Sequence, residues 1–166
     1  MQISKTSPIR IVVLTPFFLF IFCISVFGQA NSFDYVFGIF QANCVNSGCH
    51  NNSDKAGNLN LQGINADPEI RKQEVINQLI NAVPFNTQAQ QKGYVLVRPG
   101  VYWESFLFKK INNGLAPNIT LDSTEGTQMP VYSVLQPKDI EIIRQWIIFG
   151  AKQKDSSIIQ NFIDTA

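Results

Sequence analysis

The only histidine of this 166-residue chain, His50, directly follows Cys49, and Cys44 lies five residues before Cys49. The whole sequence holds three Cys, one His and two Met, so few side chains can bind a soft or borderline metal. A site built on several histidines is therefore excluded. This removes the multi-histidine zinc centres and the proteins that need one histidine for each of several haem irons.

The first thirty residues have the pattern of a secretory signal peptide. Lys5 and Arg10 precede an apolar run over residues 11–27, and small residues follow it. We predict that residues 1–28 are a signal peptide cut before Gln29, because the run is at the lower limit for a spanning helix and contains a proline. The expected product is periplasmic or otherwise exported, and it is anchored in the membrane only if the leader is retained.

Charge and composition limit the partners and the number of domains. Lys plus Arg is 13 and Asp plus Glu is 12, so the basic excess typical of nucleic-acid binding is missing and no nucleic-acid partner is expected. With 45% hydrophobic and 15% charged residues, the chain is of globular composition. We predict a single domain over residues 31–152, followed by a C-terminal tail over 153–166.

Apolar periodicity and capping residues predict an all-α domain of about four helices. The predicted helices are Ser32–Asn43 with Ser32 as N-cap, Ile70–Ala82 opened by Asp67-Pro68-Glu69, a short helix at about Tyr102–Ile111, and Lys138–Phe149 between Pro137 and Gly150. Residues 86–93 and 112–128 are predicted loops, the second long enough to suggest a functional role. The phenylalanine stripe of the first helix is the natural partner for the wide apolar face of the last.

The stretch Cys44-Val-Asn-Ser-Gly-Cys49-His50 has the residue order that covalent haem attachment requires. Two cysteines form thioethers to the porphyrin, and the adjoining imidazole becomes the proximal ligand of the iron. The usual spacing has two residues between the cysteines, and here there are four. Asn46, Ser47 and Gly48 are suited to the tight turn that accommodates the longer spacing.

Met129 is the only methionine after the initiator, and it lies 79 residues beyond His50 at the end of the second predicted loop. A thioether is a good sixth ligand for haem iron, and a loop can carry it to the face opposite a histidine. A lone methionine more often fills a gap in the core. Its place beside Pro130, outside the periodic segments, favours the ligand role.

These residues together resemble the single-haem cytochrome c domain in its planctomycete-type form. The resemblance spans nearly all of the mature chain and rests on Cys44 to His50, Leu59, Leu61, Val97-Arg98-Pro99-Gly100, Glu104-Ser105-Phe106-Leu107, Lys110-Ile111, Met129-Pro130, Leu135, Asp139-Ile140, Ile143, Trp146-Ile147 and Gly150-Ala151. It implies a cytochrome c-like fold around one haem c, with the first and last helices crossing. It also implies covalent attachment through Cys44 and Cys49 and iron ligation by His50 and Met129.

The expected function is an electron carrier between redox partner proteins rather than an enzyme, because two axial ligands leave the iron no open site. Three alternatives stay open at this point. In the first, Met129 is a labile ligand and the protein senses a gas or reacts with peroxide. In the second, the chain is a haem-free exported interaction domain with a Cys44–Cys49 disulfide. In the third and least favoured, Cys44, Cys49 and His50 bind zinc. Arg98 is a candidate partner for a haem propionate, although a solvated surface arginine is the default.

Overall fold

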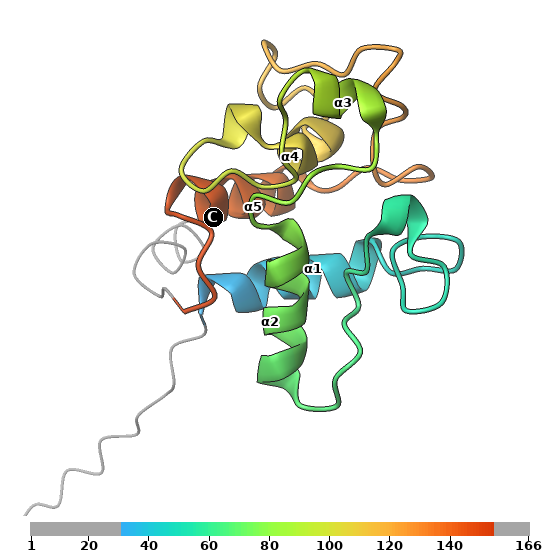
Figure 1. The fold of residues 1–166 in the computed structure, drawn as a ribbon. Coiled ribbons are helices and arrows are strands. Elements are labelled where there is room, and N and C mark those ends of the chain that lie inside the picture. Colours follow the sequence, from blue (N-terminus) through green and yellow to red (C-terminus); the bar gives the residue numbers. More distant parts are fainter. Residues whose placement is uncertain (1–30, 155–166) are drawn as a thin grey trace, which may run out of the picture.

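Helices form all the regular secondary structure of residues 31–154, the part of the chain that the computed structural model describes (Figure 1). There are five α-helices in this part, namely α1 (Ser32–Asn43), α2 (Pro68–Leu79), α3 (Thr87–Gln91), α4 (Phe106–Ile111) and α5 (Pro137–Ile148), and two 3-10 helices at Ala56–Asn58 and Tyr102–Glu104. The described residues form no strand, only isolated bridges from Ile80 to Val97 and from Val95 to Ser105. The prediction of an all-α chain is confirmed, with five α-helices rather than about four.

The predicted signal peptide, residues 1–28, and the tail beyond Lys154 lie outside the described residues. Between residues 31 and 154, no helix is both long and apolar enough to cross a membrane.

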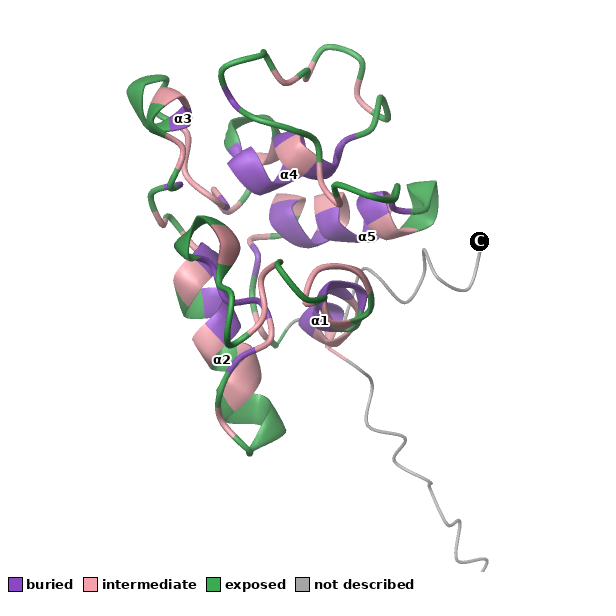
Figure 2. Ribbon diagram, turned by 90° about the vertical axis from the view of Figure 1, so that its right-hand side faces the viewer, coloured by how far each residue is buried: buried purple, intermediate pink, exposed green. Residues whose placement is uncertain are grey.

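Helices α1 and α5 meet at the centre of the molecule, as the complementary apolar stripes predicted. Figure 2 shows α1 end-on while α5 runs across the view, so the two helices cross, and their buried faces are turned toward each other. The Phe33 and Trp146 rings lie 5.2 Å apart between centroids, and both side chains are almost fully buried. Helix α4 packs against α5, and α2 stands beside α1 in both views.

The capping signals of the sequence are mostly found where they were expected. Asp67 accepts hydrogen bonds from the backbone N–H groups of Glu69 and Ile70 at the start of α2. Helix α5 starts at Pro137 and is followed by Gly150, which adopts a φ of +97°. The N-cap of α1 was wrong by one residue. Asn31 occupies that position, and its N–H donates to the Asp34 carboxylate at 2.9 Å.

Three further expectations need correction. Residues 86–93 are not all loop, because Asn86 accepts from the Ala89 N–H and caps the short helix α3. The segment Tyr102–Ile111 is not one helix, because Ser105 is extended where its backbone bridges to Val95. Phe149, predicted as the last residue of the final helix, comes after α5 ends and is 41% exposed.

The predicted loop after α4 has no regular secondary structure, and side chains of its own hold it to the domain. Asn112 is buried, and its amide donates to the carbonyls of Ala116 and Ile119 at 2.8 and 2.6 Å. Its side-chain oxygen accepts from the Ala116 N–H at 2.7 Å. The loop leaves α4 and returns at Met129, whose N–H donates to the carbonyl of Lys110 at 2.8 Å.

Candidate functional site

The segment from Cys44 to His50 forms one compact turn directly after α1. The Cys44 N–H donates to the Phe40 carbonyl at 2.8 Å, which closes the last turn of the helix. The chain then folds back, so that the His50 N–H donates to the Cys44 carbonyl at 3.0 Å. The left-handed φ of +76° at Gly48 allows this reversal. The two thiols and the imidazole are therefore carried by a single short loop.

Asp54 and Asn51 fix the shape of this loop. The Asp54 carboxylate accepts from the Gly48 N–H and from the Asn51 amide, both at 2.7 Å. The Asn51 amide also donates to the Asn46 carbonyl at 2.9 Å. The hydrogen bonds from Asn51 and Gly48 hold the pKa of Asp54 below its usual value. The four residues between the cysteines are thus held in place by an anchor outside the motif.

A cavity of about 530 Å³ opens beside the turn. Cys44 and His50 line it, and so does Met129 from the far end of the loop after α4. Most of the remaining wall is apolar and comes from α1, α4, α5 and the segments between them, namely Phe40, Leu59, Leu61, Leu96, Phe106, Leu107, Ile111, Leu135 and Ile143. Three of the four predicted site residues thus line one cavity. Cys49 does not line it, although it lies in the same turn beside His50.

The His50 imidazole is suited to bind a metal. Burial lowers its pKa below the usual value, and backbone groups of Leu59 and Ala56 oppose that shift only in part. The ring is therefore neutral at pH 7, with a lone pair available to a metal. Its Nδ1 atom is buried and makes no hydrogen bond. An imidazole bound to a metal through one nitrogen commonly donates its other N–H to a carbonyl or carboxylate.

Cys44 is a protonated thiol at neutral pH. Burial raises its pKa to about 12, and the neighbouring Cys49 adds to that shift. Both cysteines are free in the structure. Zinc is bound by thiolates, so zinc binding at this turn would require Cys44 to lose its proton. No group of three or more His, Cys, Asp or Glu side chains among residues 31–154 is placed to hold a metal ion.

A buried ion pair beside the cavity was not predicted from the sequence. Glu125 is fully buried, lines the cavity, and accepts from the ammonium group of Lys109 at 2.7 Å and of Lys92 at 3.0 Å. Burial acts to raise the pKa of Glu125, but the hydrogen bonds from Lys109, from the Asp122 N–H and from Lys92 outweigh it and the pKa falls. The sequence carried no signal for this pair beyond the adjacent lysines that follow an apolar run, Lys109 and Lys110.

Arg98, the candidate propionate partner of the sequence, does not line the cavity. Its Nε atom instead lies 2.7 Å from a carboxylate oxygen of Glu104, and both side chains are exposed to solvent. The cation that does line the cavity is Lys110, which sequence reasoning missed.

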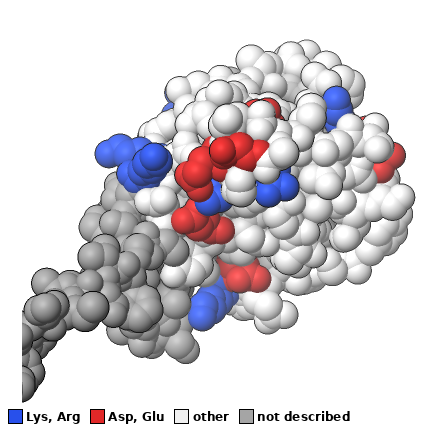
Figure 3. Space-filling model, turned by 90° about the horizontal axis from the view of Figure 1, so that it is seen from below, with Lys and Arg blue, Asp and Glu red and all other residues white. Residues whose placement is uncertain are grey.

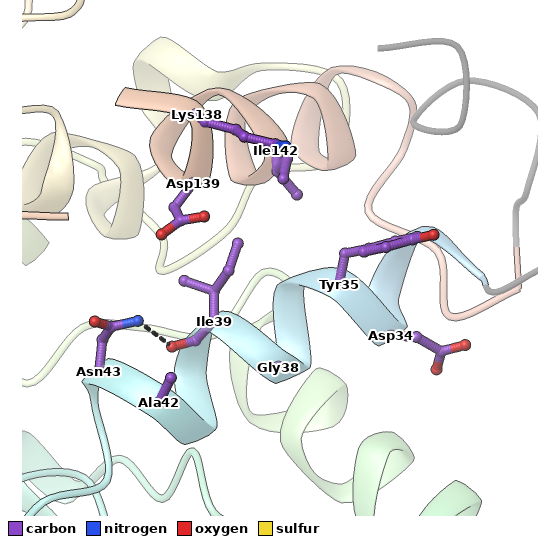
Figure 4. A pocket seen from close by; sticks show the side chains of 9 residues that line it. All are labelled: Asp34, Tyr35, Gly38, Ile39, Ala42, Asn43, Lys138, Asp139 and Ile142. Atoms are coloured by element: carbon purple, nitrogen blue, oxygen red, sulfur yellow. Dashed lines mark hydrogen bonds between the residues drawn. The ribbon is translucent and has the colours of Figure 1, made fainter. Parts of the chain in front are cut away.

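A second hollow of about 450 Å³ lies between α1 and α5 (Figure 4). Its lining residues are Asp34, Tyr35, Gly38, Ile39, Ala42 and Asn43 of α1 and Lys138, Asp139 and Ile142 of α5. None of them is a sulfur or imidazole ligand. On the face seen in Figure 3, positive and negative side chains are intermixed among a larger number of uncharged ones. The described residues of that face form no extended patch of one sign.

Comparison with protein-family models, with curated proteins and with solved structures found no match to this chain.

Proposed function

We propose that this chain is an exported single-haem c-type cytochrome that carries electrons between redox partner proteins. The observation that carries the proposal is the cavity, whose walls bring together Cys44, His50 and Met129 from two segments far apart in the sequence. These are among the few side chains of the chain that can bind a soft or borderline metal.

The residues of the cavity fit a haem in three respects. The volume of about 530 Å³ lies within the range of about 300–1,000 Å³ that is typical of cofactor and ligand sites. Its apolar lining suits a porphyrin, and the neutral imidazole of His50 and the thioether of Met129 suit its iron. The buried Nδ1 of His50 is a polar atom that no described protein group satisfies, and a buried polar atom of this kind calls for a ligand or a water as its partner.

Each of these side chains has a defined task in the proposed carrier. Cys44 and Cys49 would hold the porphyrin through thioether bonds, and His50 and Met129 would bind its iron. A haem with these ligands supplies reversible one-electron exchange between its ferric and ferrous states. The apolar wall excludes water from the site, and the Met129 thioether favours the ferrous state more than a second histidine does. With two protein ligands on the iron, electron transfer would be favoured over the binding of an external ligand.

The test is a visible spectrum, oxidised and reduced, and an intact mass of the exported full-length protein. We expect a c-type spectrum, the mass of one covalently bound haem, and an N-terminus at Gln29. The Cys44→Ala/Cys49→Ala double variant is expected to lose the covalent haem. A colourless wild-type protein lacking this mass contradicts the proposal and favours the haem-free domain with a Cys44–Cys49 disulfide.

The role of Met129 is tested separately. Met129→Leu keeps an apolar side chain in the cavity wall but removes the sulfur, so we expect an altered spectrum and rapid binding of carbon monoxide to the reduced protein. Leu135→Ala is the matched control, because Leu135 lines the same cavity and carries no ligand atom. Rapid carbon monoxide binding by the wild type would instead support the labile-ligand alternative, a gas sensor or peroxidase.

A further inference from the structure

Lys110 is the only lysine or arginine among the residues that line the cavity. Its ammonium group donates to the carbonyls of Glu125 at 2.9 Å and of Thr127 at 2.7 Å. An ammonium has three N–H donors, so one remains without a hydrogen-bond acceptor among the described residues, although the nitrogen also lies 5.4 Å from the centroid of the Phe106 ring. The side chain is half-buried, and burial lowers its pKa below the usual value. A partly desolvated cation with a free donor thus stands in the cavity wall.

The charges around Lys110 do not balance within the protein. Lys92 pairs with Asp122 and Glu125, and Lys109 pairs with Glu125, whereas Lys110 makes no ion pair within residues 31–154. Three lysines therefore face two carboxylates, which leaves one positive charge. The uncompensated charge belongs to the lysine that lines the cavity.

The backbone at Gly126 leaves room for the Lys110 ammonium group, and the backbone of Lys110 itself bonds to Met129. Gly126 has a φ of +80°, and a Cβ atom at that position would lie 3.2 Å from the Lys110 ammonium nitrogen. The carbonyl of Lys110 accepts the Met129 N–H at 2.8 Å. Lys110 therefore holds the segment from Glu125 to Met129 against the cavity, through its ammonium group and through its backbone carbonyl.

We propose that Lys110 binds a carboxylate of the ligand in this cavity and also positions the segment that carries Met129. If the ligand is the haem of the proposed function, on which this inference rests, the carboxylate is a porphyrin propionate. A carboxylate at this position neutralises the positive charge that remains among Lys92, Lys109 and Lys110. It also accepts a hydrogen bond from the third N–H of the Lys110 ammonium group. Ion pairs of this kind are strongest when the charges are partly removed from water.

The test compares three variants of the purified holoprotein by resonance Raman spectroscopy and redox titration. Lys110→Gln removes the charge, and we expect the propionate bending band to shift and the midpoint potential to fall, since a nearby cation favours the less positive ferrous haem. Lys110→Arg keeps the charge but changes the donor geometry. It is expected to shift the band and to leave the potential close to that of the wild type. Lys92→Gln removes a charge from the solvent side of the cluster and is expected to leave the band unchanged.

Two results would overturn the inference. One is a propionate band in Lys110→Gln that is identical to that of the wild type, and the other is an equal shift in Lys92→Gln. If Lys110→Gln does not fold, the Lys110→Arg band decides the matter, because an unchanged band excludes contact with the carboxylate. Failure of the proposed function has a different signature, since the wild-type protein would then carry no haem.

Discussion

Neutralising Glu125 tests whether the buried ion pair beside the cavity is a stability element. Glu125→Gln keeps the shape of the side chain and an oxygen that can accept the Asp122 N–H, but it leaves the Lys109 ammonium without its carboxylate. At 2.7 Å and an effective dielectric of about 20, the Coulomb attraction alone is about 6 kcal/mol. Desolvation of both groups offsets much of this attraction, and removing one partner of a buried pair typically costs about 3–5 kcal/mol.

The expected cost lies at the lower end of that range, at about 3 kcal/mol. Lys109 keeps two contacts that relieve its lost partner, since its Nζ atom lies 3.3 Å from the Tyr94 hydroxyl and 4.7 Å from the centroid of the Tyr94 ring. Such contacts contribute about 1 kcal/mol when the cation is partly desolvated.

The assay is urea unfolding at pH 7 followed by far-UV circular dichroism, applied to Glu125→Gln, Lys109→Met and the double variant. Because the two side chains form one unit, we expect a coupling energy of about 2–3 kcal/mol, so that the double variant is far less destabilised than the sum of the singles. Glu104→Gln is the control, since the exposed Arg98–Glu104 pair should be worth less than about 1 kcal/mol. A coupling energy below about 0.5 kcal/mol would refute the reasoning.

Three further outcomes are expected, two from other parts of the fold and one from Glu125 itself. Phe33→Ala, at a fully buried position against Trp146, should lower the free energy of unfolding by about 3–5 kcal/mol in the same urea assay, and a loss below about 1 kcal/mol would contradict the packing of α1 on α5. Gly63→Ala should cost more than about 1 kcal/mol, because φ is +73° and the new Cβ would meet the Arg71 side chain; an unchanged unfolding midpoint would argue against this geometry. The lowered pKa of Glu125 means that its contribution is present above the pKa of an unfolded glutamate, about 4.3, and is lost as the pH falls through the folded value. Stability measured between pH 7 and pH 3 should therefore fall less steeply in Glu125→Gln than in the wild type, and equal slopes would count against the shift.

The parts of the fold that could be predicted are those determined by neighbours in sequence. Asp67 and Pro68 predict the start of α2 because a capping carboxylate and a fixed φ act within one turn. The stripe that includes Phe33 predicts the buried face of α1 because its period is a property of the helix itself.

What could not be predicted depends on tertiary contacts. Helix α3 has no apolar period, and its single buried residue, Ala89, gives no pattern to recognise. The break at Ser105 follows from its bridge to Val95 and from the hydrogen bond between its hydroxyl and the Arg98 N–H. Glu125 lies in a polar predicted loop, where the sequence gives no sign that the side chain is buried. Only the folded chain brings Lys109 and Lys92 to it.

The candidate site divides in the same way. The turn from Cys44 to His50 is local, and the scarcity of methionine alone points to Met129. Arg98 was a candidate partner for a propionate, with a solvated surface position as the default, and it lies at the surface beside Glu104 while Lys110 lines the cavity wall. Both residues are basic and both follow apolar stretches, so the sequence does not distinguish them. The fold does, because Lys110 of α4 lines the cavity whereas Arg98, in the segment before α4, pairs with Glu104.

The loop after α4 connects stability to the proposed function. Its two anchors, the Asn112 side chain at its start and the Lys110 carbonyl and ammonium at its end, fix the position of Met129 without any helix or strand in between. The ion pair of Glu125 with Lys109 ties the same loop to α4. A substitution that loosens these contacts should therefore displace Met129 before it unfolds the core between α1 and α5, because the contact of Phe33 with Trp146 involves no residue of the loop. If Met129 binds the haem iron as we propose, loss of this ligand and loss of the fold are then two separate transitions, and the polar contacts of the loop determine how far apart they lie.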